Sequence, residues 1–176
     1  TIAGTLAGAN PILLIRKMLP AYFTAIGTQS SAATIPVTLN QTKENGVNEG
    51  IADFTIPLCA TIHLSGSTIT LVSCSMAVMM LHGMPITFSG MFGFILMLGV
   101  TMVAAPGVPG GAVMAALGLL ESMLGFGPEL TSLMIALYLT QDSFGTACNV
   151  TGDGAISIIV NRIAGFKLIP PKKEEV

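Results

Sequence analysis

Residues 147–154 read ACNVTGDG and place an amide and a carboxylate inside a chain that is otherwise mostly apolar. Gly and β-branched residues, which are weak helix formers, surround Asn149 and Asp153. A carboxylate in an apolar environment is costly unless it has a partner. The fold must therefore supply a partner for the Asp153 carboxylate, and this requirement limits which kinds of fold the chain can adopt.

The composition predicts a membrane protein. Hydrophobic residues make up 52% of the 176 residues, charged residues make up 9%, and the mean hydropathy is +0.79. Residues 54–120 contain no Asp, Glu, Lys or Arg. A soluble domain of this size has no core that could bury such a stretch, so lipid must cover much of it.

The positive charges predict a topology in the cell membrane. They fall in three groups, Arg16 and Lys17, Lys43, and a C-terminal group of Arg162, Lys167, Lys172 and Lys173. All of them can be cytoplasmic if an even number of membrane crossings separates each group from the next. We therefore expect a multi-pass protein with a cytoplasmic C-terminus. No nucleic-acid partner is expected.

Clusters of Gly, Pro and small polar residues divide the apolar sequence into short segments. Surface loops are expected near 41–50, 82–88 and 125–130, and further breaks within the membrane at 27–36, 63–68, 105–111 and 145–154. Segments of about 12–18 residues are too short to cross a bilayer comfortably, which is typical of re-entrant hairpins and interrupted helices.

The breaks predict an all-α membrane protein built from two inverted repeats, each a re-entrant helical hairpin followed by a broken transmembrane helix. The expected order is a first hairpin within 1–42, with its helices from about residue 10, a broken helix over 48–81, a second hairpin over 88–124, a last transmembrane helix over 129–165 that is interrupted at 145–154, and a cytoplasmic tail over 166–176. Interrupted segments at matching places in two halves indicate the binding site of a transporter.

Six polar residues of the last segment share one helix face, because they are spaced three or four residues apart. They are Tyr138, Asp142, Thr146, Asn149, Asp153 and Ser157. Ionisable residues within a membrane segment predict a functional site. His63, at the break within 48–81, has two open interpretations, a functional imidazole or a buried His with satisfied hydrogen bonds.

Four motifs resemble the dicarboxylate/amino acid:cation symporter family, also called the glutamate-transporter-like or sodium:dicarboxylate symporter family. They are GTQSSAATIPVTL (27–39), GVNEGIADFTIPLCATIHLSGST (46–68), APGVPGGAVM (105–114) and GTACNVTGDG (145–154). The resemblance covers only the C-terminal transport core of that family, residues 1–176, so we expect a fragment of a longer protein. It implies a homotrimer, a scaffold domain that this chain lacks, and a core that moves across the lipid bilayer like an elevator.

The resemblance also implies roles for individual residues. Substrate binding is expected at Ser31, Ser67, Val108, Asp142, Gly145, Thr146 and Asn149. A coupling sodium ion is expected near Cys59, Thr61, His63, Asn149 and Asp153. The function implied is cation-coupled symport of an amino acid, and the protein is not expected to be an enzyme.

Two departures from the family pattern refine this prediction. Members that carry acidic substrates have an Arg where this chain has Gly145, so a neutral amino acid is favoured over an acidic one because an extra carboxylate would be buried unpaired. A dicarboxylate or glutamate/aspartate symporter is the alternative. The family's Asn-Met-Asp-Gly-Thr is here His63-Leu64-Ser65-Gly66-Ser67, which leaves open fewer sodium ions or a proton on His63.

Two other classes fit the sequence less well. An intramembrane aspartyl protease needs two carboxylates in contact, whereas Asp142 and Asp153 would lie about 16 Å apart along one helix. A channel would favour rings of carbonyls or charged side chains.

Overall fold

The computed structural model describes residues 1–169, and all regular structure within this range is helical. The helices are α1 (Ile2–Ala7), α2 (Pro11–Thr28), α3 (Ser31–Glu44), α4 (Glu49–Ile62), α5 (Ser65–Leu81), α6 (Phe88–Met102), α7 (Gly111–Leu124) and α8 (Pro128–Ile163). The all-α prediction is confirmed. Most of the predicted tail, from residue 170 onward, lies outside the described residues.

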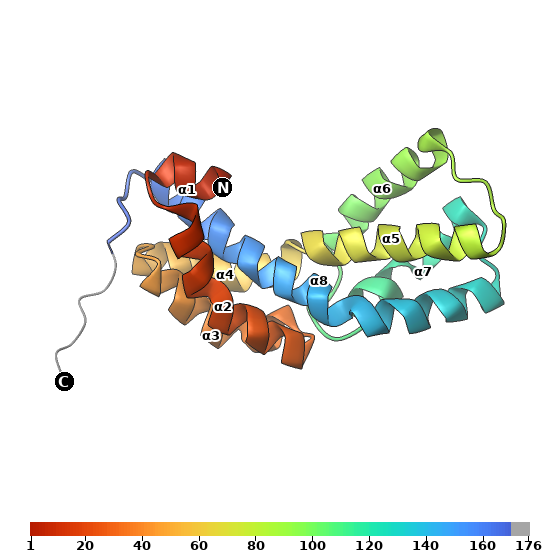
Figure 1. Cartoon of the computed structure of the whole chain (residues 1–176), viewed down its shortest axis with the longest axis horizontal. Helices are drawn as coiled ribbons and strands as arrows, with labels where there is room; N and C mark the ends of the chain where they lie inside the picture. The colour runs from red at the N-terminus through yellow and green to blue at the C-terminus, as the bar shows by residue number, and fades with distance from the viewer. Residues whose placement is uncertain (170–176) are drawn as a thin grey trace.

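Helix α8 is the centre of the molecule, since α1, α2, α3, α4, α5 and α7 all pack against it. Helices α2 and α3 form one hairpin and α6 and α7 a second. Figure 1 shows the first hairpin at one end of the long axis and the second at the other. Helices α4 and α5 follow one another along α8, which runs in the opposite direction.

The turns lie where the breaks are predicted, with one exception. The first hairpin turns at Gln29 and Ser30, α4 ends at Ile62 before α5 begins at Ser65, and residues 103–110 connect α6 to α7. Ser30 caps the N-terminus of α3, since its Oγ accepts a hydrogen bond from the Ala33 amide at 3.1 Å.

The predicted interruption at 145–154 is wrong, because α8 continues without a break from Pro128 to Ile163. Its glycines mark close contacts instead. A Cβ at Gly145 would press on Thr70 and the first turn of α5, a Cβ at Gly152 would overlap the His63 ring, and a Cβ at Gly154 would overlap Met18. The small residues that suggest a break therefore allow other elements to approach α8.

Helices α5 and α8 make the closest of these contacts. A Cβ at Gly66 would overlap the carbonyl oxygen of Gly145. Small residues at such crossings let helix backbones approach each other in membranes. The crossing sets the position of the α5 N-terminus relative to the middle of α8.

One stretch of the described residues, Glu49–Leu81, is long and apolar enough to cross a membrane by length and composition, and it comprises α4 and α5. Helices α6 and α7 are apolar but shorter. Large apolar side chains stay exposed on α1, α2 and α4 to α8, among them Ile12 and Phe23 of α2, Ile69 and Met80 of α5, and Phe88 and Val100 of α6. Exposed apolar surface of this extent is typical of contact with lipid or another protein.

Gly66→Ala tests the crossing of α5 and α8. The added methyl group would be forced against the backbone of α8, so the variant should lose about 1–3 kcal/mol of unfolding free energy. Thermal unfolding of the full-length protein in detergent measures the change. Gly118→Ala is the matched control, since a Cβ there has no neighbour within 4 Å and should be neutral or stabilising. Equal unfolding temperatures for the two variants would contradict the predicted close contact.

Candidate functional site: the cavity between the two hairpin tips

Six of the seven predicted substrate-binding residues line one cavity at the middle of the molecule. They are Ser31, Ser67, Val108, Asp142, Thr146 and Asn149. The cavity lies between the tips of both hairpins, the start of α5 and the polar face of α8. The volume that the centre of a water molecule can occupy is about 10 Å³, so the cavity has room for one water molecule. A molecule larger than one water would enter only if the surrounding elements moved apart.

Asp142 is buried, with 3% of its surface exposed, and both of its oxygens have partners. The Tyr138 hydroxyl donates to Oδ1 at 2.8 Å. The backbone amide of Gly110, which precedes α7, donates to Oδ2 at 2.8 Å. A helix N-terminus stabilises a negative charge, so the second hairpin helps to compensate this carboxylate.

The hairpin tips are also bonded to each other. The carbonyl oxygen of Gly107 accepts hydrogen bonds from the Ser30 hydroxyl at 2.8 Å and from the Ala32 amide at 3.2 Å. A Cβ at Gly107 would overlap the Ala60 carbonyl of α4, so only glycine allows this approach. The loop over 103–110 thus bonds both to the N-terminus of α3 and to Asp142.

Asn149 holds the break between α4 and α5 against α8. Its Oδ1 accepts from the amides of Gly66 at 2.8 Å and Ser67 at 3.4 Å, and its Nδ2 donates to the Ser67 hydroxyl at 2.9 Å. The side chain therefore satisfies backbone donors of the first turn of α5, which have no partners within that helix.

Asp153 and His63 form a close pair. The His63 Nδ1 lies 2.7 Å from Asp153 Oδ1, with the carboxylate side chain 1% exposed and the imidazole 23% exposed. Gly152 lacks the side chain that would overlap the imidazole ring. In this arrangement the Asp153 carboxylate faces an imidazole nitrogen rather than a set of oxygen atoms.

The other predicted cation ligands are less close to a common site. The Cys59 carbonyl accepts from the His63 amide at 2.8 Å. The Thr61 hydroxyl donates to the Leu58 carbonyl at 2.8 Å on an exposed part of α4. Gly145 does not line the cavity but is buried against the start of α5.

Six further residues line the cavity that the sequence did not assign to the site: Gln29, Leu64, Pro106, Gly107, Ala112 and Tyr138. Tyr138 belongs to the polar face of α8, so its spacing from Asp142 was a usable signal. Gln29 and Pro106 lie within the predicted breaks, but the breaks alone do not indicate which residue faces the cavity.

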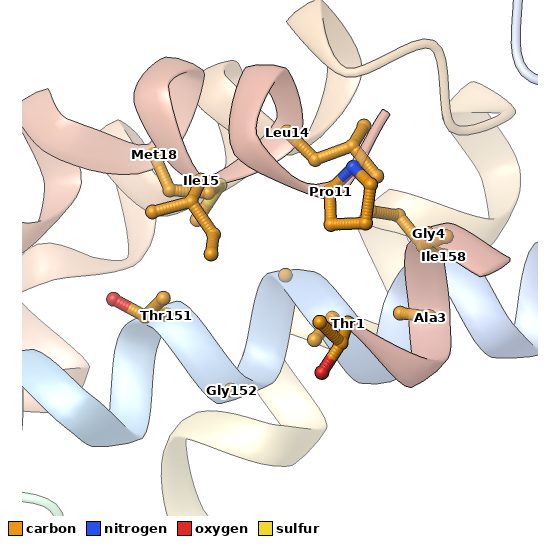
Figure 2. A pocket seen from close by; sticks show the side chains of 12 residues that line it. Thr1, Ala3, Gly4, Pro11, Leu14, Ile15, Met18, Thr151, Gly152 and Ile158 are labelled. Carbon is orange, nitrogen blue, oxygen red and sulfur yellow. The ribbon is translucent and has the colours of Figure 1, made fainter. Parts of the chain in front are cut away.

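A larger cavity lies between α1, α2 and α8 (Figure 2), with about 220 Å³ for the centres of water molecules. Its lining is mostly apolar and includes Leu14, Met18 and Ile158. It contains no charged side chain, whereas the small central cavity contains Asp142. A polar substrate therefore fits the central cavity better.

The two buried carboxylates of α8 have different partners, Tyr138 and Gly110 for Asp142 and His63 for Asp153. They do not contact each other as the shared proton of an aspartyl protease requires.

Comparison with known proteins decides the family. Residues 1–163 match the sodium:dicarboxylate symporter family. The chain belongs to this family. The family and the relatives below are transporters, not enzymes.

The relatives of this chain are named either as excitatory amino acid transporters or as serine/threonine transporters. The chain is 30% identical over 145 residues to an excitatory amino acid transporter of Caenorhabditis elegans, a match that covers 82% of this chain. It is 28% identical over 160 residues, 90% of this chain, to excitatory amino acid transporter 1 of Homo sapiens. It is 31% identical over 157 residues, 86% of this chain, to the serine/threonine transporter SstT of Acinetobacter baumannii.

The matched region is a minor part of these relatives. It spans 29% of each of the two excitatory amino acid transporters and 39% of the serine/threonine transporter. The family assignment therefore concerns this region.

Asp142→Ala tests the bond between α8 and the second hairpin. Without the carboxylate, the Gly110 amide loses its acceptor, so hydrogen exchange across residues 104–110 should become faster. Exchange followed by mass spectrometry on the full-length protein gives the result. Gln141→Ala, which changes an exposed neighbour, should leave this exchange unchanged. Unchanged exchange in Asp142→Ala would mean that the bond does not hold the tip.

Proposed function

We propose that this chain is the transport core of a secondary active transporter that carries a neutral amino acid together with a cation. The observation that carries the proposal is that a buried carboxylate and a helix N-terminus meet at one cavity. Asp142 supplies a negative charge and the first turn of α3 supplies backbone amides. The family and the names of the relatives support transport of amino acids.

The two ends of an amino acid match these two groups. Its ammonium group would bond to Asp142, and its carboxylate would bond to the amides at the start of α3, where Ser31 lies. Both groups already bond to the second hairpin, Asp142 through the Gly110 amide and the Ala32 amide of α3 through the Gly107 carbonyl. Substrate binding would therefore exchange hydrogen bonds to the hairpin for hydrogen bonds to the amino acid, and the hairpin would move.

The charges around the cavity favour a neutral side chain. No Lys or Arg lines it, and the five of residues 1–169 lie in the N-terminal half of α2, at the end of α3 and at or after the end of α8. An acidic side chain would bring a second carboxylate close to Asp142 without a cationic partner, at a cost of several kcal/mol. The relative named as a serine/threonine transporter is consistent with a neutral substrate, and those named excitatory amino acid transporters keep glutamate or aspartate as the alternative.

The coupling cation would compensate Asp153, with sodium as the first candidate because of the family. Its ligands would come from Asp153, Asn149 and the carbonyl groups near Cys59. Since Asn149 bonds to α5 and His63 bonds to Asp153, these side chains would have to rearrange around sodium. A proton is the alternative cation.

The arrangement of the helices supports an inverted repeat. One unit would comprise α2 to α5 and the other α6 to α8, with the two hairpins entering from opposite sides of a cell membrane and their tips meeting at its middle. In this proposal the Lys and Arg residues of α2, α3 and the end of α8 are cytoplasmic, and so is the C-terminus. The full-length protein would be a homotrimer held together by a scaffold, against which this core moves like an elevator.

Uptake by the full-length protein in liposomes tests the function. A sodium gradient directed inward should drive accumulation of serine or alanine, and Asp153→Asn should lower it roughly tenfold or more because the cation loses its charged ligand. The control is Glu121→Gln, at an exposed position near the end of α7. A proton gradient imposed separately identifies the alternative cation. Uptake that responds to neither gradient would contradict symport.

A competition panel tests the preference for neutral substrates. Labelled serine uptake should be inhibited by small neutral amino acids at lower concentrations than by glutamate, aspartate or a dicarboxylate, because the cavity offers no cation for a second carboxylate. Stronger inhibition by glutamate or a dicarboxylate would overturn the preference while leaving the transporter function intact.

A further inference from the structure

Gln29 has a backbone conformation that is unusual for its residue type. It ends α2 with φ 51° and ψ 24°, and within residues 1–169 no other residue except glycine has a positive φ. Glycine adopts this left-handed conformation without steric cost. A glutamine in such a position suggests that its side chain has a use, since strained residues cluster at functional sites.

The residues on either side hold the turn in place. The Gln29 amide donates to the Ala25 carbonyl at 2.9 Å and caps α2. The hydroxyls of Thr28 and Thr34 are 2.8 Å apart, which joins the end of α2 to the first turn of α3. The Ser30 hydroxyl donates to Gly107 of the other hairpin. Hydrogen bonds on both sides therefore hold the backbone of Gln29 in its left-handed conformation.

Gln29 is one of the residues that line the cavity, together with Asp142 and Gly107, and it is half-buried. No hydrogen bond among residues 1–169 involves its side-chain amide. Other polar groups of the lining are already bonded, since Asp142 bonds to Tyr138 and Gly110 and Asn149 bonds to the start of α5. Gln29 can therefore form a new hydrogen bond without breaking an existing one.

We propose that Gln29 is a specificity-determining residue that hydrogen-bonds the side chain of the substrate and selects neutral amino acids that carry a hydroxyl or amide. A primary amide offers both a donor and an acceptor, so it can bond to either group. The ends of the amino acid are left to Asp142 and the amides of α3, which suit ionic groups better. This inference rests on the proposed function and adds the substrate class.

Threonine and valine provide the sharpest test, because they are nearly equal in shape and differ by one hydroxyl. Uptake of labelled serine by the full-length protein in liposomes is measured while each amino acid is titrated as a competitor. The unmodified protein should favour threonine over valine, and Gln29→Gly should reduce that ratio about 2- to 10-fold, the worth of one neutral hydrogen bond. Gln29→Asn also tolerates the left-handed conformation and should give an intermediate ratio, because its shorter amide reaches less far.

Stability separates this role from a structural one. Gln29→Gly should unfold at the same temperature as the unmodified protein or a higher one, since glycine relieves the backbone conformation. Gln141→Ala, at an exposed site outside the cavity, should keep the threonine-to-valine ratio. An unchanged ratio in both Gln29 variants, with uptake of amino acids retained, would overturn the inference and spare the proposed function. Absence of any amino-acid uptake by the unmodified protein would overturn both.

Discussion

Two buried carboxylates in the middle of an apolar helical body require partners, and the structure around the cavity supplies a different one for each. Asp142 bonds to a phenol and to the amide before α7, and Asp153 bonds to the imidazole of His63. Removing carboxylates from water is costly unless such partners are in place. The tip of the second hairpin supplies the Gly110 amide and the break between α4 and α5 supplies His63, whereas Tyr138 comes from α8 itself.

Backbone groups at these breaks have the same requirement. The start of α5 bonds to Asn149, and the start of α3 bonds to Gly107. In a bilayer an unsatisfied backbone group finds no water, so irregular backbone must face protein or a wet cavity. The tips, the break and the polar face of α8 therefore converge. A cavity bounded by exchangeable hydrogen bonds is a consequence of this convergence, and it suits a protein that must bind and release a polar molecule.

Most of the fold could be predicted from the positions of apolar segments and small residues, but the continuity of α8 could not. Gly145, Gly152 and Gly154 have the composition of a break, yet each faces a close neighbour, namely α5, His63 and Met18. Sequence alone does not distinguish a glycine that permits a turn from one that permits contact. For the site, family resemblance indicated six residues of one cavity, whereas the partners of Asn149 and the conformation of Gln29 depend on contacts between distant segments.

A structure of the full-length protein with a bound neutral amino acid tests the central claim most directly. The account predicts the ammonium group on Asp142 and the carboxylate at the first amides of α3, with Gly107 and Gly110 released from their present partners. An amino acid bound elsewhere, for example between α1, α2 and α8, while Gly107 and Gly110 keep their hydrogen bonds, would contradict it.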